Sequence, residues 1–238
     1  MSVAEVELIL FLLDGSESMK WKETEDKRPK REYLNEIVMN VLKRFRNSGK
    51  ASCYKISLVS FAWDAFVIKT PDKISYYSID YAIDAYQDPV DVTGSGTTSI
   101  SHAISAARQI LDEFAADEGM PDDKNATILL FTDGMETDKL GDPTTGDEVR
   151  KEAMSLISHP VSPSLATISF GLDADEELLT MIATKPNQRQ KDHLRNARVY
   201  RHLPNKDKLF LVGHDSGIVT KEKVETIRNF IEILSMTV

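Results

Sequence analysis

The sequence predicts an α/β fold of three layers, in which helices cover both faces of a mostly parallel central sheet. Two segments, 6–14 and 125–134, are almost entirely apolar, as strands buried on both faces of a parallel sheet are. Between the predicted strands, apolar residues recur at helical spacing. A pair of strands joined by Trp63 and Asp64 adds one antiparallel edge strand. Alternating strands and helices of this kind are typical of α/β layer folds.

The first half of the chain contains three predicted strands and three predicted helices. We expect the strands at residues 6–14, 54–62 and 65–70. We expect the helices at about 34–45, within 74–86 and at about 100–114. The first and third helices carry a continuous apolar stripe, whereas the second is ambiguous between helix and strand. The charged segment 19–30 is predicted to be a solvated loop.

The second half repeats the alternation with more polar connections. We expect strands at 125–134 and 164–171, and an edge strand at 197–203. We expect helices at about 147–158, 175–184 and 221–236. The polar stretches 135–146 and 185–196 are predicted to be surface loops. No change of composition divides the chain, so we expect a single domain over 1–238, with a core of about 5–205 on which the last helix packs.

Composition and charge exclude several functional classes. The 238 residues carry a net charge of −9, which disfavours binding to nucleic acid or to an anionic membrane. Cys53 is the only cysteine, so neither an internal disulfide nor a cysteine-based zinc site is expected. The first apolar run is too short for a membrane span and lacks the basic segment of a signal peptide. We therefore expect a protein of a reducing compartment, the cytoplasm.

Oxygen-bearing side chains follow several of the predicted strands. Asp14 and Asp133 end the two most apolar strands, and Ser16 and Ser18 follow Asp14 at alternating positions. Ligand sites in open α/β sheets gather at the carboxyl ends of the strands, where a loop containing Thr97 and Thr98 is also expected. Carboxylates and hydroxyls without histidine or cysteine suit Mg²⁺, with Mn²⁺ or Ca²⁺ as alternatives.

Three motifs resemble the von Willebrand factor A (VWA) domains. "DGSES" (14–18) matches their D-x-S-x-S motif, "GSGTTSISHAI" (94–104) resembles their second motif, and "LLFTDG" (129–134) their third. The resemblance implies a Rossmann-like sandwich with a metal-ion-dependent adhesion site. It implies the following ligands: Asp14, Ser16, Ser18, Thr98 and Asp133. Thr97 stays open as an alternative to Thr98.

The resemblance also implies a non-enzymatic protein-binding module. The cation of such a site accepts an acidic residue from a protein partner. Glu17, Glu136 and Asp138 are expected to form an acidic rim around it, and Glu17 stands where many members carry glycine. The setting implied is an intracellular stress-response, signalling or AAA+-associated assembly, and the oligomeric state is not predicted.

Two other functions remain open at the same site. A metal-dependent phosphoester hydrolase would also use two acids and Mg²⁺, although no lysine or histidine is evident near these loops. A structural domain whose metal ties the loops together is the third hypothesis. The stretch "GHDSG" (213–217) resembles part of a serine protease, but a turn is the better interpretation. The five histidines lack metal-ligand spacing and are expected at the surface.

Overall fold

A six-stranded sheet forms the centre of the molecule. The structure is a computed structural model and describes residues 5–235. In spatial order the strands are β3 (Ala65–Val67), β2 (Tyr54–Phe61), β1 (Val6–Asp14), β4 (Lys124–Thr132), β5 (Ser164–Ser169) and β6 (Phe210–Val212). Every neighbouring pair is parallel except β2 and β3. The predicted α/β fold with one antiparallel edge strand is therefore confirmed.

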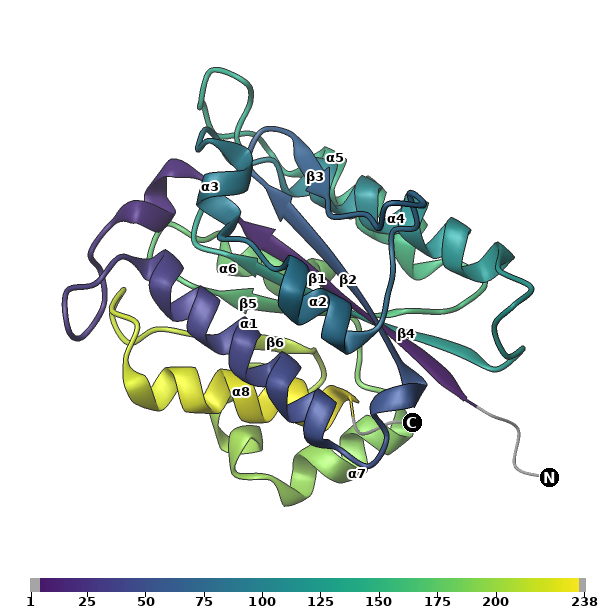
Figure 1. The fold of residues 1–238 in the computed structure, drawn as a ribbon. Coiled ribbons are helices and arrows are strands. Elements are labelled where there is room, and N and C mark those ends of the chain that lie inside the picture. The colour runs from purple at the N-terminus through teal and green to yellow at the C-terminus, as the bar shows by residue number, and fades with distance from the viewer. Residues whose placement is uncertain (1–4, 236–238) are drawn as a thin grey trace.

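Helices cover both faces of this sheet (Figure 1). One face carries α1 (Lys30–Asn47), α2 (Ile79–Ala85) and α8 (Lys221–Ser235), with α7 (Gln188–Asn196) beside α8. The other face carries α4 (Ile100–Ala116), α5 (Asp147–Ile157) and α6 (Glu176–Ile182). The short α3 (Pro89–Thr93) and three 3₁₀ helices, η1 (Glu17–Lys20), η2 (Ala51–Cys53) and η3 (Arg198–His202), lie in the connections.

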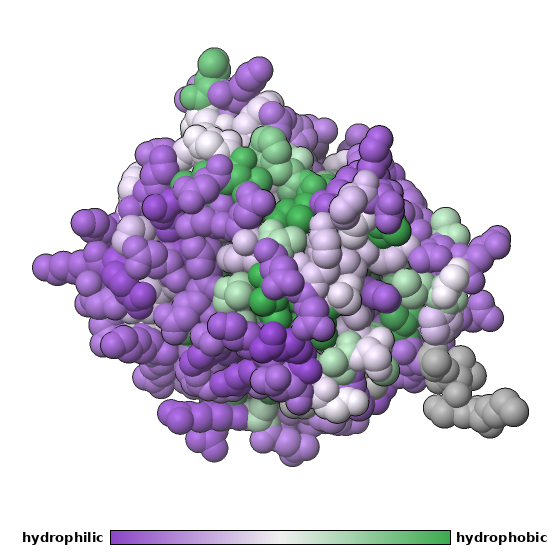
Figure 2. Space-filling view, in the orientation of Figure 1, coloured by the Kyte–Doolittle hydropathy of each residue, from purple (hydrophilic) through white to green (hydrophobic). Residues whose placement is uncertain are grey.

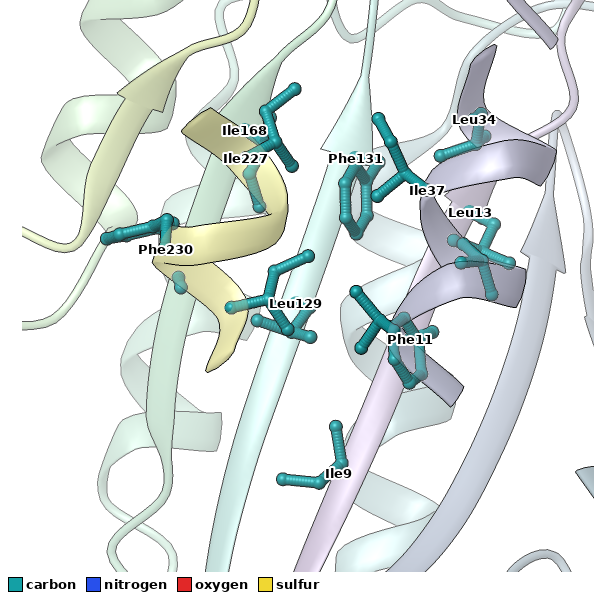
Figure 3. Packing of buried hydrophobic residues seen from close by; sticks show 14 of the residues in the cluster. Ile9, Phe11, Leu13, Leu34, Ile37, Leu129, Phe131, Ile168, Ile227 and Phe230 are labelled. Atoms are coloured by element: carbon teal, nitrogen blue, oxygen red, sulfur yellow. The ribbon is translucent and has the colours of Figure 1, made fainter. Parts of the chain in front are cut away.

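The two faces of the sheet pack into two separate apolar clusters. Along β1, Ile9, Phe11 and Leu13 belong to the cluster under α1 and α8 (Figure 3). Leu8, Leu10 and Leu12 belong to the cluster under α4, α5 and α6. Successive side chains of a strand point to opposite faces, so a strand covered on both sides must be apolar at every position. This explains the uninterrupted apolar run that predicted β1.

Two predictions about the C-terminal third are wrong. Residues 185–196 do not form a loop throughout, because α7 begins after a capping box made by Asn187 and Gln190. Only two side chains of α7 are buried, so the helix has no apolar stripe by which to be recognised. Residues 197–203 form η3 instead of a strand, and the edge strand is the three-residue β6. The predicted end of the last helix, residue 236, lies outside the described residues.

The order of the strands places one site at the carboxyl edge of the sheet. β1 pairs with β2 on one side and with β4 on the other, so the loops after β1 and β4 diverge from a switch in strand order. Asp14 ends β1, and Asp133 directly follows β4. Among the residues described, no helix has the length and apolar character needed to cross a membrane.

Candidate metal centre

Four of the five predicted ligands lie in one hydrogen-bonded network. The backbone N–H of Ser16 donates to Asp14 Oδ1 over 2.8 Å, and the hydroxyls of Ser16 and Ser18 are 3.1 Å apart. The Ser18 hydroxyl then donates to Asp133 Oδ1 over 2.7 Å. Asp14, Ser16 and Asp133 are buried, and Ser18 is half-buried. Loops separated by more than a hundred residues thus bring two carboxylates and two hydroxyls together.

The second loop brings Thr98 next to the acid loop. A methyl group placed on Gly134 would lie 3.1 Å from Thr98 Oγ1, so this hydroxyl lies beside the residue that follows Asp133. The backbone N–H of Thr137 donates to the Thr98 carbonyl over 2.9 Å and fixes the two loops together. The Thr97 methyl instead lies near Gly141. Of the two threonines, it is Thr98 whose hydroxyl lies against this loop.

The electrostatics of the two acids favour a bound cation. Burial, and second to it the nearby Asp133 carboxylate, raise the pKa of Asp14 to about 7, against the hydrogen bonds from Ser16 and Thr132. Thr132 Oγ1 donates to Asp14 Oδ2 over 2.6 Å, so both Asp14 oxygens are oriented. A divalent cation would restore the ionised form of such a pair. Carboxylate and hydroxyl oxygens fit Mg²⁺, Mn²⁺ or Ca²⁺.

The hydroxyl groups are essential to this donor set. Within residues 5–235, no group of three or more His, Cys, Asp or Glu side chains could hold a metal ion. A cation at Asp14 and Asp133 would therefore take its remaining protein ligands from serine and threonine.

Lys30 lies in the centre, although no lysine was expected there. Its Nζ is 2.7 Å from Asp133 Oδ2 and 2.7 Å from Glu23 Oε2, and its side chain is 1% exposed. Burial by itself would lower the pKa of Lys30, but Asp133 and Glu23 outweigh burial and raise it. The segment 19–30 is therefore not a purely solvated loop, because its last residue begins α1 and points inward. The signal available in the sequence was a lysine directly after Pro29, at a helix start where positive charge is unfavourable.

Glu136 is not an exposed rim acid, which corrects the sequence-based expectation. It is 6% exposed, and its carboxylate accepts hydrogen bonds from the backbone N–H of Ile100 and, over 2.6 Å, from the Ser101 hydroxyl. Burial raises the pKa of Glu136, while these bonds oppose the rise. Because the first N–H groups of a helix lack partners within it, Glu136 caps α4 from the third loop. Glu136 is thus a buried structural residue of the metal centre and not part of an exposed acidic rim.

The other two predicted rim acids differ in exposure. Glu17 is exposed, accepts a hydrogen bond from Ser95 and pairs with Lys20 over 2.9 Å. The Ser95 bond is the main reason that the pKa of Glu17 is lowered. Asp138 is half-buried, and its Oδ1 accepts from two backbone N–H groups of the 138–142 turn over 2.8 and 3.0 Å. Glu17 is thus the predicted rim acid that faces solvent most fully.

A second polar cluster lies at the same edge of the sheet, beyond β5 and β6. His214 Nε2 is 3.2 Å from Ser169 Oγ and 3.3 Å from Glu176 Oε1, and His214 Nδ1 accepts from the Gly217 N–H over 3.1 Å. One nitrogen faces both serine and glutamate, so no serine–histidine–acid relay exists. His214 is 6% exposed and Ser169 is fully buried, which corrects the expected surface position of this histidine. Burial lowers the pKa of His214.

Comparison with known proteins identifies the family. The model of the von Willebrand factor type A domain matches residues 9–205. Mouse inter alpha-trypsin inhibitor, heavy chain 4, is 22% identical over 177 residues, which are 74% of this chain and 17% of the relative. The chain thus spans under a fifth of that relative's length.

Solved structures share the fold at low sequence identity. Proximal thread matrix protein 1 from the mussel byssus aligns with a TM-score of 0.65 and 16% identity, over 98% of this chain and 49% of its own. Another structure of that mussel protein, described with a zinc-occupied MIDAS motif, aligns at 0.57 and 18% identity over 98% and 46%. A von Willebrand factor type A structure from Catenulispora acidiphila aligns at 0.58 and 17% identity over 98% and 42%. This chain therefore belongs to the von Willebrand factor type A domain family, whose members are metal-dependent protein-interaction modules.

Proposed function

We propose that this protein is a non-enzymatic binding module whose divalent cation coordinates an acidic residue of a protein partner. The proposed ligands are Asp14, Ser16, Ser18, Thr98 and Asp133. The observation that carries the proposal is the 2.7 Å hydrogen bond from Ser18 to Asp133, which joins the first and third motif loops between two buried carboxylates. Mg²⁺ is the expected ion, because the donor set contains oxygen alone.

The chain's own residues orient the donors before a cation arrives. Ser16 N–H and Thr132 Oγ1 each hold one oxygen of Asp14, and Ser18 holds one oxygen of Asp133. Hydroxyl ligands add coordination without adding charge, so two carboxylates offset the two charges of the ion. When bound, the cation supplies an electrophilic position for a partner's carboxylate oxygen.

Exposed apolar side chains near the centre support a protein partner over a small molecule. They are Trp21 (47% exposed), Met135 (42%) and Leu172 (67%). Trp21 lies over the Lys30 ammonium, Met135 follows Asp133 by two residues, and Leu172 follows a glycine packed against Asp133. Single exposed apolar residues are common, but several around one site indicate an interface. The proposed partner segment carries its acidic residue among apolar neighbours.

Hydrolysis of a phosphoester at this centre is less well supported. Lys30 supplies the positive charge that such an enzyme would need, yet its side chain is buried and its Nζ is held between Asp133 and Glu23. It is not presented to a substrate. A base held within hydrogen-bonding reach of an attacking water is the second requirement, and Asp14 and Asp133 are both engaged as described above.

The cysteine content bears on the cellular setting. Cys53 is a free, half-buried thiol, and one cysteine cannot form an internal disulfide. This is compatible with a reducing compartment. We place the module in the cytoplasm, in a stress-response, signalling or AAA+-associated assembly.

Calorimetric titration with Mg²⁺ and Mn²⁺ tests the metal centre directly. The parent protein and Asp138→Ala should bind the cation, whereas Asp14→Ala should not. Asp138→Ala is the matched control, because it removes an acid of the third loop that holds only its own turn. Absence of binding to the parent at several millimolar would contradict the proposal.

A pull-down in Mg²⁺ and in EDTA then tests partner binding. A protein retained by the parent in Mg²⁺ should be released by EDTA and should not be retained by Asp14→Ala. Turnover of p-nitrophenyl phosphate that disappears in Asp133→Ala would favour the hydrolase instead.

A further inference from the structure

We infer that Lys30 is a resident counter-charge of the metal centre, which weakens divalent-cation binding and leaves the loaded centre with net positive charge for a partner carboxylate. This inference rests on the proposed function and adds a residue that the three sequence motifs do not contain. It makes Lys30 a determinant both of how tightly the ion is held and of how strongly the ion attracts its partner.

The ammonium of Lys30 occupies a closed niche between the first and third loops. Its Nζ is 2.7 Å from Asp133 Oδ2 and 2.7 Å from Glu23 Oε2. A methyl group on Gly171 would come within 3.1 Å of this nitrogen, and the Trp21 ring centre lies 5.4 Å from it. The surroundings therefore hold the ammonium beside Asp133 instead of letting it extend into water.

Helix formation does not explain a lysine at this position. Lysine is almost never fully buried without a partner. Lys30 is also the first residue of α1, where the helix dipole disfavours a positive charge. Desolvation of an ammonium is costly unless the ammonium is paired. The compensation comes from Asp133 together with Glu23, so the burial of Lys30 depends in part on the metal centre.

Lys30 divides the oxygens of Asp133 between two partners. Ser18 donates to Oδ1, and the Lys30 ammonium pairs with Oδ2. Before any cation binds, Oδ1 thus accepts a hydrogen bond, and Oδ2 faces the ammonium in an ion pair without accepting one. A cation that draws on Asp133 must compete with an ammonium already at 2.7 Å.

The formal charges show what this competition does. When both are ionised, Asp14 and Asp133 carry two negative charges, and Lys30 reduces them to one. A divalent cation then makes the centre positive by one charge, whereas it would only neutralise a centre without Lys30. Glu23 offsets part of this effect, but its side chain is 43% exposed and water screens it. Lys30 therefore weakens cation binding and strengthens the attraction of the loaded centre for a carboxylate.

The variant Lys30→Met tests the inference, and Lys20→Met is its matched control. Lys20 belongs to the same loop region, but its side chain is 42% exposed and pairs with Glu17 instead of Asp133. Titrated with Mn²⁺, Lys30→Met should bind about tenfold more tightly than the parent, since one neighbouring charge shifts ion binding by about this much. Lys20→Met should stay within about twofold of the parent, because exposed charges are screened.

Two further readouts separate charge from general damage. In EDTA, Lys30→Met should melt several degrees below the parent, because Asp133 loses its counter-charge. In Mn²⁺, the concentration of acetate that displaces metal-bound water, followed by water-proton relaxation, should rise in Lys30→Met. A variant that was merely misfolded would bind Mn²⁺ more weakly, not more tightly.

Glu23→Gln provides an independent test should Lys30→Met not fold. Glu23 is half-exposed, and removing its charge leaves the ammonium to Asp133 alone. We expect Mn²⁺ binding to weaken about threefold, opposite in sign to Lys30→Met. If the parent binds Mn²⁺ and these variants match it, the inference is wrong and the proposed function stands. If parent, Lys20→Met and Lys30→Met all fail to bind, both fail.

Discussion

Two polar clusters lie at the carboxyl edge of one sheet and differ in how their charges are balanced. At β1 and β4, two buried carboxylates lie together, and the Lys30 ammonium pairs with one of them, Asp133. At β5 and β6, His214 contacts Ser169 and Glu176 through one nitrogen and accepts from the Gly217 N–H through the other. The first cluster retains negative charge inside the protein. In the second cluster, both nitrogens of the buried imidazole have protein partners, so no bound ion is needed.

The difference shows that position in the fold is not sufficient to make a site. Parallel strands bring polar loop residues together at this edge wherever they end. Whether a cluster binds something depends on the buried charge that its own hydrogen bonds leave uncompensated. The β1–β4 cluster has more buried negative charge than its own positive charge compensates, whereas the buried group of the β5–β6 cluster is an imidazole. Figure 2 shows hydrophilic residues over most of the viewed face, around a band of apolar ones, so polar character alone does not mark a site.

The largest expected effect is on metal affinity, which a substitution in the first cluster should lower and a substitution in the second should not. Asp14→Asn should lower Mg²⁺ and Mn²⁺ affinity by more than about 100-fold, because it removes one of the two charged ligands and outer groups alone contribute 10–100-fold. Ser169→Ala should leave the affinity unchanged. Calorimetry on both variants measures this, and equal losses would show that the two clusters act as one site.

The pH dependence of metal binding should follow the first cluster. The pKa of Asp14 is raised to about 7 by burial and by Asp133, so protons compete with the cation below that pH. Mn²⁺ affinity should fall by up to about tenfold per pH unit as the pH decreases from about 7. Titrations at several pH values check this. A flat profile down to about pH 5 would mean that Asp14 is already ionised in the metal-free protein.

The second cluster should instead control stability in acid. Burial lowers the pKa of His214, despite Glu176 and Asp215 nearby, and Lys223 lowers it further. As the pH falls, His214 is therefore protonated in the unfolded chain before it is protonated in the folded protein. The contribution of the neutral His214 to folding stability is complete above about pH 6.5 and is lost as the pH falls below it. Protonation also removes the acceptor for Gly217, worth about 1 kcal/mol.

Urea unfolding at pH 7.5 and pH 5.5 measures the effect of His214. The parent in EDTA should lose more stability between these two values than His214→Gln, which cannot be protonated in this range. An equal loss in both proteins would assign the acid sensitivity to other groups.

The smallest expected effect concerns the exposed rim. The pKa of Glu17 is lowered, mainly by the Ser95 hydrogen bond, so the side chain is charged at neutral pH. Because it is exposed and screened over about 8 Å, Glu17→Gln should change Mn²⁺ affinity by less than about threefold. Binding of an acidic partner should strengthen, measurably so at low salt. A large change in metal affinity would place Glu17 among the ligands.

The sequence predicted elements and donors whose signals are local. The apolar runs of β1 and β4 and the helical stripe of α4 are readable because many of their side chains are buried at a regular period. The helix α7 and the strand β6 were missed, since one buries two side chains and the other has three residues. The five proposed ligands could be predicted because each stands at a strand end or in a motif.

By itself the sequence determined the α/β fold and the family, and it predicted the set of oxygen donors that we propose. Only the tertiary structure decided that Lys30 enters the centre, that Glu136 caps α4 and that His214 is buried. The physical reason is that a charged or polar side chain is buried only where a partner compensates its desolvation. The partners here lie far away in the chain, Asp133 for Lys30 and Ser169 for His214, so no local pattern reveals them.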